Sequence, residues 1–344
     1  MENKVRIGFI GSGGIGISHA GMLFQQVKDA QLVALQDPNQ GALDKLINFL
    51  KTDEYLKPPH VVNEVNTDKI ARFSDYHDML ANAQLDAVFV LSPHTLHYEH
   101  IKAALEHGLH VLVEKPFTCS VKHGKELIKL AKRKKKVLVV SYQRHTVGLF
   151  KYMRDLVAKG AVGDISLVSA YQIQEGKARL GTWRSDPKLA GGGQLNDSGS
   201  HLLAEILWVT GLKMKEVYAS VNNHGLEVDM TDALTVTFAN GARGSIGVSA
   251  QVSTPYSEEL TIWGSKGAIM HRDGQLTVYG EDGKAYQPDK AQFPASSRPE
   301  IAFINAITGR EALPEDDLRI ALDTVWLTQS AYISSEKRKP VVYK

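Results

Sequence analysis

The 344-residue sequence is poor in cysteine: Cys119 is the only one, so no disulfide can form within the chain. It also lacks any apolar run long enough to span a bilayer, and no cleavage-site pattern precedes the first strand-like run at Val5. The net charge is only +2, so the whole chain offers no strong field to nucleic acid or to an anionic membrane. These absences predict a cytoplasmic protein without a membrane or nucleic-acid partner.

Two local features, a basic run and the single cysteine, are each explained by an ordinary structural role. The basic run "KRKKK" at 132–136 follows a helical pattern, and cations are favoured at a helix C-terminus by the helix dipole, so a solvated helix end is expected. No cysteine-nucleophile motif surrounds Cys119, which is therefore interpreted as a small packing residue.

Length and periodicity predict two domains of different classes. Residues 1–142 alternate continuous apolar runs such as "DAVFVLS" with helical patterns, which indicates an α/β domain with a parallel sheet covered on both faces. Residues 143–344 place helical segments around alternating strands with glycine-bearing turns, which indicates an α+β domain with an antiparallel or mixed sheet. A polar stretch at 52–70 is interpreted either as a rim element or as a tolerated loop.

A glycine motif directly follows the first predicted strand. "IGFIGSGGIGISHAG" holds Gly11, Gly13 and Gly16 in G-x-G-x-x-G spacing, ahead of a helix. The first glycine permits a tight turn, the second lets backbone N–H groups approach a pyrophosphate, and the third allows close packing of helix on strand. Strand, glycines and helix together predict a Rossmann dinucleotide-binding domain.

Asp37 ends the second predicted strand, 21 residues after Gly16, where a ribose-binding acid is expected. A carboxylate accepts hydrogen bonds from both ribose hydroxyls but repels a 2′-phosphate, and the neighbours Gln36, Pro38 and Asn39 include no arginine. The expected cofactor is therefore NAD in preference to NADP.

Two further stretches carry groups suited to acid–base chemistry. "VLVEKPF" places Lys115 at the carboxyl end of a predicted strand, the edge where open α/β sheets bind ligands. "GGGQLNDSGSHLLAEILWVTG" places Asp197 and His201 four residues apart at the expected start of a helix, so both are predicted to project from one face. The alternatives are a surface lysine, an N-cap aspartate and a backbone-bonded core histidine.

In combination, these motifs resemble those of the Gfo/Idh/MocA oxidoreductases. The resemblance covers nearly the whole chain and includes "EKP", D-x-x-x-H, "YQR" at 142–144 and "WRSDPKLAGGG" from Trp183. It implies a Rossmann domain joined to an α+β domain with a large open, mostly antiparallel sheet, whose outer face builds a homodimer or homotetramer. It also implies that Lys115, Asp197 and His201 form the catalytic group, with the glycines letting their loop close over the substrate.

The expected site residues follow from the motifs and the resemblance together. The cofactor-binding residues are expected to be Gly11, Ser12, Gly13, Gly14, Ile15, Gly16, Asp37, Ser92, Pro93, His97, Glu114 and Lys115. The substrate-binding residues are expected to be Lys115, Arg144, Tyr171, Trp183, Arg184, Asp197 and His201. No metal site is expected, because the histidines at 94, 97 and 100 drift around a helix axis without an acidic or cysteine partner.

The expected function is NAD-dependent hydride transfer at a secondary alcohol or ketone of a sugar, sugar derivative or cyclitol. His201 is the expected general base or acid, Asp197 orients it, and Lys115 hydrogen-bonds the reacting oxygen. Two alternatives stay open: a non-catalytic dinucleotide-binding sensor, and a glycoside-cleaving enzyme that uses a tightly held NAD.

Overall fold

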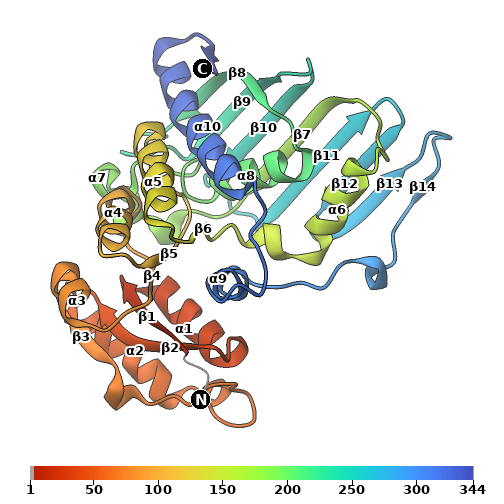
Figure 1. The fold of residues 1–344 in the computed structure, drawn as a ribbon. Helices are drawn as coiled ribbons and strands as arrows, with labels where there is room; N and C mark the ends of the chain where they lie inside the picture. Colours follow the sequence, from red (N-terminus) through yellow and green to blue (C-terminus); the bar gives the residue numbers. More distant parts are fainter. Residues whose placement is uncertain (1–3, 344) are drawn as a thin grey trace. The chain divides into compact units, whose positions relative to one another are not determined.

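The computed structural model describes residues 4–343 and divides them into two compact units (Figure 1). The first unit comprises the chain up to Thr118, residues 122–141 and residues 298–318. The second comprises residues 119–121, residues 142–297 and the chain from Arg319 onward. No helix among the described residues has the length and apolar character needed to cross a membrane.

A six-stranded, fully parallel sheet forms the centre of the first unit. Its strand order is β3-β2-β1-β4-β5-β6, so the direction of winding reverses between β1 and β4, where open α/β sheets bind ligands. The strands are β1 (Val5–Ile10), β2 (Ala30–Gln36), β3 (Ala71–Phe73), β4 (Ala87–Val90), β5 (His110–Val113) and β6 (Leu138–Val140). The predicted doubly covered parallel sheet is confirmed by β4, which is buried at every residue.

Helices alternate with these strands, as the helical patterns between the apolar runs predicted. They are α1 (Gly14–Gln26), α2 (Gln40–Thr52), α3 (Tyr76–Asn82), α4 (His97–Glu106), α5 (Val121–Lys134) and α9 (Pro299–Ile307). The sequence pattern did not predict α3 or α9. The 52–70 stretch packs against α1, where the buried Asn63 amide donates to the backbone oxygens of Leu23 and Val27.

Residues 298–318 lie with the first unit, although the linear boundary at 142/143 assigned them to the second domain. The reason is apolar: Phe303 and Ile304 of α9 are buried in the same core as α1 and the parallel sheet. The Phe303 ring meets that of Phe89 on β4 edge to face, with centroids 5.8 Å apart. The first unit is therefore assembled from separate stretches of sequence.

A nine-stranded sheet forms the second unit, in the order β14-β13-β12-β11-β7-β10-β9-β8-β15. Only β10 and β7 pair in parallel, so the predicted open, mostly antiparallel sheet is confirmed. The strands are β7 (Ile165–Ile173), β8 (Met214–Asn222), β9 (Thr231–Phe238), β10 (Arg243–Ser249), β11 (Ser257–Gly264), β12 (Gly267–Arg272), β13 (Gln275–Tyr279), β14 (Ala285–Tyr286) and β15 (Val341–Val342).

Helices cover one face of this sheet (Figure 1). They are α6 (Gly148–Ala158), α8 (Gly199–Thr210) and α10 (Asp317–Lys337), while the short α7 (Pro187–Ala190) precedes the glycine loop. Alternate residues of β9 and β10 are buried against the helices, and those between them are exposed or half-buried. Assembly through the outer face stays a prediction.

Candidate active site

The glycine turn after β1 has the geometry of a dinucleotide cradle. Gly11 has φ +96°, and a Cβ there would lie 2.8 Å from the backbone of Leu91, so only glycine fits. At Gly13 and Gly14 a Cβ would meet nothing within 4 Å, which leaves the backbone open to a ligand. No side chain caps the start of α1 and no acid occupies its first turn, so its N–H groups are suited to phosphate oxygens.

Asp37, which follows β2, is hydrogen-bonded to this glycine turn. The Asp37 carboxylate accepts the N–H of Ser12 at 2.9 Å and the N–H of Asn39 at 2.9 Å. Two bonds leave further lone pairs for ribose hydroxyls, because a carboxylate has about four acceptor positions. The residues present therefore fit a dinucleotide, and cofactor binding by these particular residues stays a prediction.

His97 links the loops that follow β4 and β5. Its Nδ1 lies 2.8 Å from the backbone oxygen of Pro116, and its Nε2 lies 3.0 Å from that of Ser92. Burial lowers the pKa of His97 below its usual value and outweighs the two carbonyl contacts. His97 therefore holds the backbone of Ser92 and Pro116 in place, and its contribution to cofactor binding stays a prediction.

Glu114 belongs to a buried charge cluster that sequence analysis missed. His19 of α1 stands between two carboxylates, with Nε2 3.0 Å from Glu114 and Nδ1 2.7 Å from Glu300. Burial opposes the charge on His19, but the two carboxylate bonds outweigh it and raise the pKa to about 9. Burial likewise opposes the charge on Glu114, yet His19 lowers its pKa. Glu114 also accepts the N–H of Lys115 at 3.2 Å, which ties the catalytic candidate's backbone to this cluster.

The start of α8 differs from the expectation. The helix begins at Gly199 with Ser198 as N-cap, so Asp197 precedes it and does not cap it. Asp197 therefore lies just outside the helix, whereas His201 lies in its first turn, and a shared orientation of the two side chains stays a prediction. The Asp197 carboxylate instead meets two cations: Arg184 Nε at 3.0 Å and Arg179 Nη1 at 3.4 Å.

Asp229 fixes the loop that carries Asp197, and no local signal in the sequence marked it. Its carboxylate accepts the N–H groups of Gly193 at 2.6 Å and Leu195 at 2.8 Å, and the hydroxyl of Tyr332 at 2.8 Å. A Cβ on Gly193 would lie 2.0 Å from the Asp229 backbone oxygen. The glycines thus allow close packing, and Asp229 holds the loop in this conformation. Closure of the loop over a substrate stays a prediction.

Arg144 was expected near the substrate, and the structure places it in a second buried cluster. Its Nε lies 2.8 Å from Glu205 of α8, and its Nη2 pairs with Glu258 of β11. Burial and the neighbouring charge of Glu258 raise the pKa of Glu205 well above its usual value. The guanidinium is therefore engaged by two carboxylates, and any contact of Arg144 with substrate stays a prediction.

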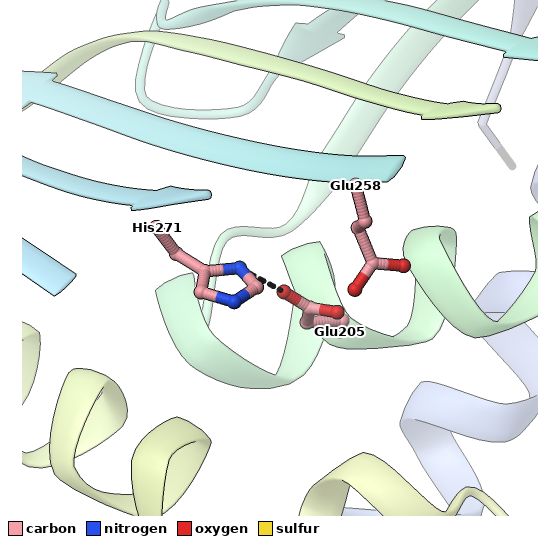
Figure 2. Close-up of side chains that lie close together, drawn as sticks. All are labelled: Glu205, Glu258 and His271. Atoms are coloured by element: carbon pink, nitrogen blue, oxygen red, sulfur yellow. Dashed lines mark ion pairs between the residues drawn. The ribbon is translucent and has the colours of Figure 1, made fainter. Parts of the chain in front are cut away.

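Glu205, Glu258 and His271 lie close enough to suggest a metal site (Figure 2). His271 Nε2 accepts the N–H of Gly274 at 3.1 Å, so the neutral ring carries its proton on Nδ1. That nitrogen faces Glu205 at 3.9 Å and, while protonated, cannot bind a cation. With Arg144 also present, the cluster is better described as an ion-pair network than as a metal centre.

The other expected substrate residues divide between two places. Trp183 and Arg184 lie together just before the glycine loop, with the guanidinium 4.4 Å from the Trp183 ring centre. Tyr171 alternates along β7 with the buried Ala170 and Gln172, so the pleat turns it to the opposite face of the sheet. The structure therefore groups Trp183 and Arg184 with Asp197 but does not bring Tyr171 to them.

Cys119 lies against the same loop, close to Ala190 and Asn196. Burial raises the pKa of its thiol to about 11, so the group is neutral and poorly nucleophilic.

Comparisons with known proteins agree with the two-unit fold and with the dinucleotide cradle. Residues 5–142 match the model of the Gfo/Idh/MocA oxidoreductase family with an NAD-binding Rossmann fold, and residues 150–270 match a C-terminal domain model of that family. The myo-inositol 2-dehydrogenase of Thermotoga maritima is 26% identical over 272 residues, which cover 77% of this chain and 75% of that protein.

Solved structures share the fold across the whole chain. The WlbA dehydrogenase of Bordetella pertussis, in complex with NADH and UDP-GlcNAcA, superimposes with a TM-score of 0.82 at 23% identity, covering 99% of each chain. A levoglucosan dehydrogenase, in complex with NADH and levoglucosan, gives 0.80 at 19% identity, again covering 99% of each chain.

Proposed function

Because the chain belongs to the Gfo/Idh/MocA oxidoreductase family, we propose that it is an NAD-dependent dehydrogenase of a secondary alcohol on a sugar or cyclitol. The observation that carries the proposal is the dinucleotide cradle at Gly11–Gly16, with the Asp37 carboxylate fixed beside it. Relatives that act on inositol and on sugars support the substrate class. The preference for NAD over NADP rests on the charge of Asp37, which repels a 2′-phosphate.

The proposed roles assign one task to each group. When bound, NAD supplies the hydride acceptor for alcohol oxidation. His201 takes the hydroxyl proton as general base, and returns it in the reverse direction. Lys115 donates a hydrogen bond to the reacting oxygen and stabilises its negative charge. Asp197, held by Arg184 and by the pinned loop, is a fixed carboxylate that keeps His201 oriented.

The test is NADH formation by purified protein with inositols, monosaccharides, anhydrosugars and glycosides. We expect turnover with NAD, and a fall in kcat of about 10²–10⁴-fold in His201→Ala, the usual contribution of a positioned acid–base group. His224→Ala is the matched control, since this histidine of the same unit is exposed and its imidazole hydrogen-bonds Thr231 at 3.1 Å, outside the proposed site.

Three results would contradict the proposal. Turnover that survives in His201→Ala would remove His201 from the chemistry. NAD binding without turnover on any alcohol in the panel would favour a non-catalytic dinucleotide sensor. NAD that stays bound through purification, with cleavage of glycosides, would favour the redox glycoside-cleaving alternative.

A further inference from the structure

Two guanidinium groups of the second unit surround the single carboxylate of Asp197. Arg184 Nε lies 3.0 Å from it and Arg179 Nη1 lies 3.4 Å from it. One carboxylate neutralises one guanidinium, so one positive charge beside the proposed catalytic pair is not matched by Asp197.

Arg179 is fully engaged within the protein. Its Nη1 donates to Gln194 at 2.7 Å and its Nη2 donates to the Ser198 hydroxyl at 2.6 Å, in addition to the contact with Asp197. Burial lowers its pKa, Asp197 opposes that effect, and the charge of Arg184 adds to it. Arg179 therefore acts as a support for the loop and for the start of α8.

Arg184 is engaged on one side only. Its Nε donates to Asp197, and among the described residues no acceptor contacts its two Nη groups. The side chain is 37% exposed, and stacking on Trp183 at 4.4 Å holds the guanidinium plane in position. The Nη edge is thus a fixed, accessible pair of donors of the kind that binds a carboxylate bidentately.

Asp197 is the acidic group that pairs with Arg184, and other acidic groups of this part of the second unit have different partners. Asp186 accepts the N–H of Lys188 at the start of α7, and Glu175 accepts the N–H of Lys177. The Asp229 carboxylate takes three hydrogen bonds from the loop and Tyr332. Burial and the charge of Asp229 raise the pKa of Asp232 to about 10, so Asp232 adds no negative charge at neutral pH.

A small hollow adjoins the two arginines and is lined by Arg179, Arg184, Asp197 and Met230 among others. Its volume of about 20 Å³ is room for one water, or for one oxygen atom of a bound group. We infer that the substrate is a sugar acid whose carboxylate binds the Nη edge of Arg184. The inference rests on the proposed function and narrows its substrate class.

The experiment compares matched pairs: neutral hexoses or hexosides and the corresponding uronic acids or uronides, each with NAD. We expect wild-type kcat/KM to favour the acid, and Arg184→Gln to lower the acid-to-neutral ratio by about 10- to 100-fold, the range for a charge-assisted hydrogen bond. Any loss that arises through Asp197 is common to both substrates and cancels in the ratio. Lys177→Gln is the charge control, because this exposed lysine lies on the same segment.

The outcomes separate this inference from the proposed function. Turnover of neutral sugars with no gain for acids, or an acid-to-neutral ratio unchanged in Arg184→Gln, would overturn the inference and leave the dehydrogenase intact. A preference for hexose phosphates over uronic acids would also overturn it, in favour of a phosphate. If no substrate is turned over, calorimetric titration of a uronic acid into wild type and Arg184→Gln tests the inference by binding alone. Equal binding by the two proteins would overturn the inference.

Discussion

Each unit buries two glutamates around one positively charged side chain. Glu114 and Glu300 flank His19 in the first unit, and Glu205 and Glu258 flank Arg144 in the second. In the first cluster the two ring nitrogens point in different directions, so each carboxylate has a donor of its own. In the second, both carboxylates share one guanidinium.

The difference shows how geometry sets the preferred protonation state. Separated carboxylates both stabilise the charge on His19 and raise its pKa to about 9, against the effect of burial. Adjacent carboxylates repel each other, and together with burial this repulsion raises the pKa of Glu205. The first cluster thus favours a charged histidine, whereas the second favours a protonated carboxyl group.

The largest expected effect comes from removing the cation of the first cluster. His19→Leu leaves Glu114 and Glu300 buried without a counter-charge, and we expect the free energy of unfolding to fall by about 3–5 kcal/mol at neutral pH. Urea denaturation measures it. Adding Glu114→Gln and Glu300→Gln to the variant is expected to restore part of the loss. A loss below about 1 kcal/mol, the scale of an exposed pair, would mean that the cluster is hydrated.

A smaller effect is expected when pH discharges His19. Its folded pKa lies above the unfolded value of 6.5, so its contribution is present below pH 6.5 and is lost as the pH rises through about 9. Integrated over this window, the loss is on the order of 3 kcal/mol. Denaturation curves across the window measure it, with Glu114→Gln/Glu300→Gln as the control that lacks the raising charges. Equal slopes in both proteins would contradict the raised pKa.

The smallest effect is expected in the second cluster. Because folded Glu205 favours its protonated form, Glu205→Gln keeps its shape and charge, and we expect less than about 1 kcal/mol of change below pH 4.5, where the carboxyl group is protonated in both the folded and the unfolded state. The contribution of Glu205 to stability is fully present below pH 4.5 and is lost as the pH rises. The free energy of unfolding of the variant should therefore increase relative to that of wild type as the pH rises. Thermal unfolding across pH measures both. A several-kcal/mol loss at neutral pH would show that Glu205 is ionised.

Sequence reasoning reached the features that are local in the chain. Gly11 and Asp37 follow strands at fixed distances, so spacing alone predicted the cradle. Spacing could not find Glu300, which meets His19 across 281 positions, or Glu258, which meets Arg144 across 114. The start of α8 was predicted too early because aspartate is a common N-cap residue. The Asp197 carboxylate is instead bound by arginines from an earlier loop.

The return of α9 to the first core has a consequence for the order of synthesis. An N-terminal Rossmann domain would be expected to fold first, as soon as its last strand leaves the ribosome. Here Phe303 and Ile304 complete the core and Glu300 completes the charge cluster, all of them far beyond β6. During translation the first unit must therefore wait, with part of its apolar surface uncovered, until nearly nine-tenths of the chain has been made.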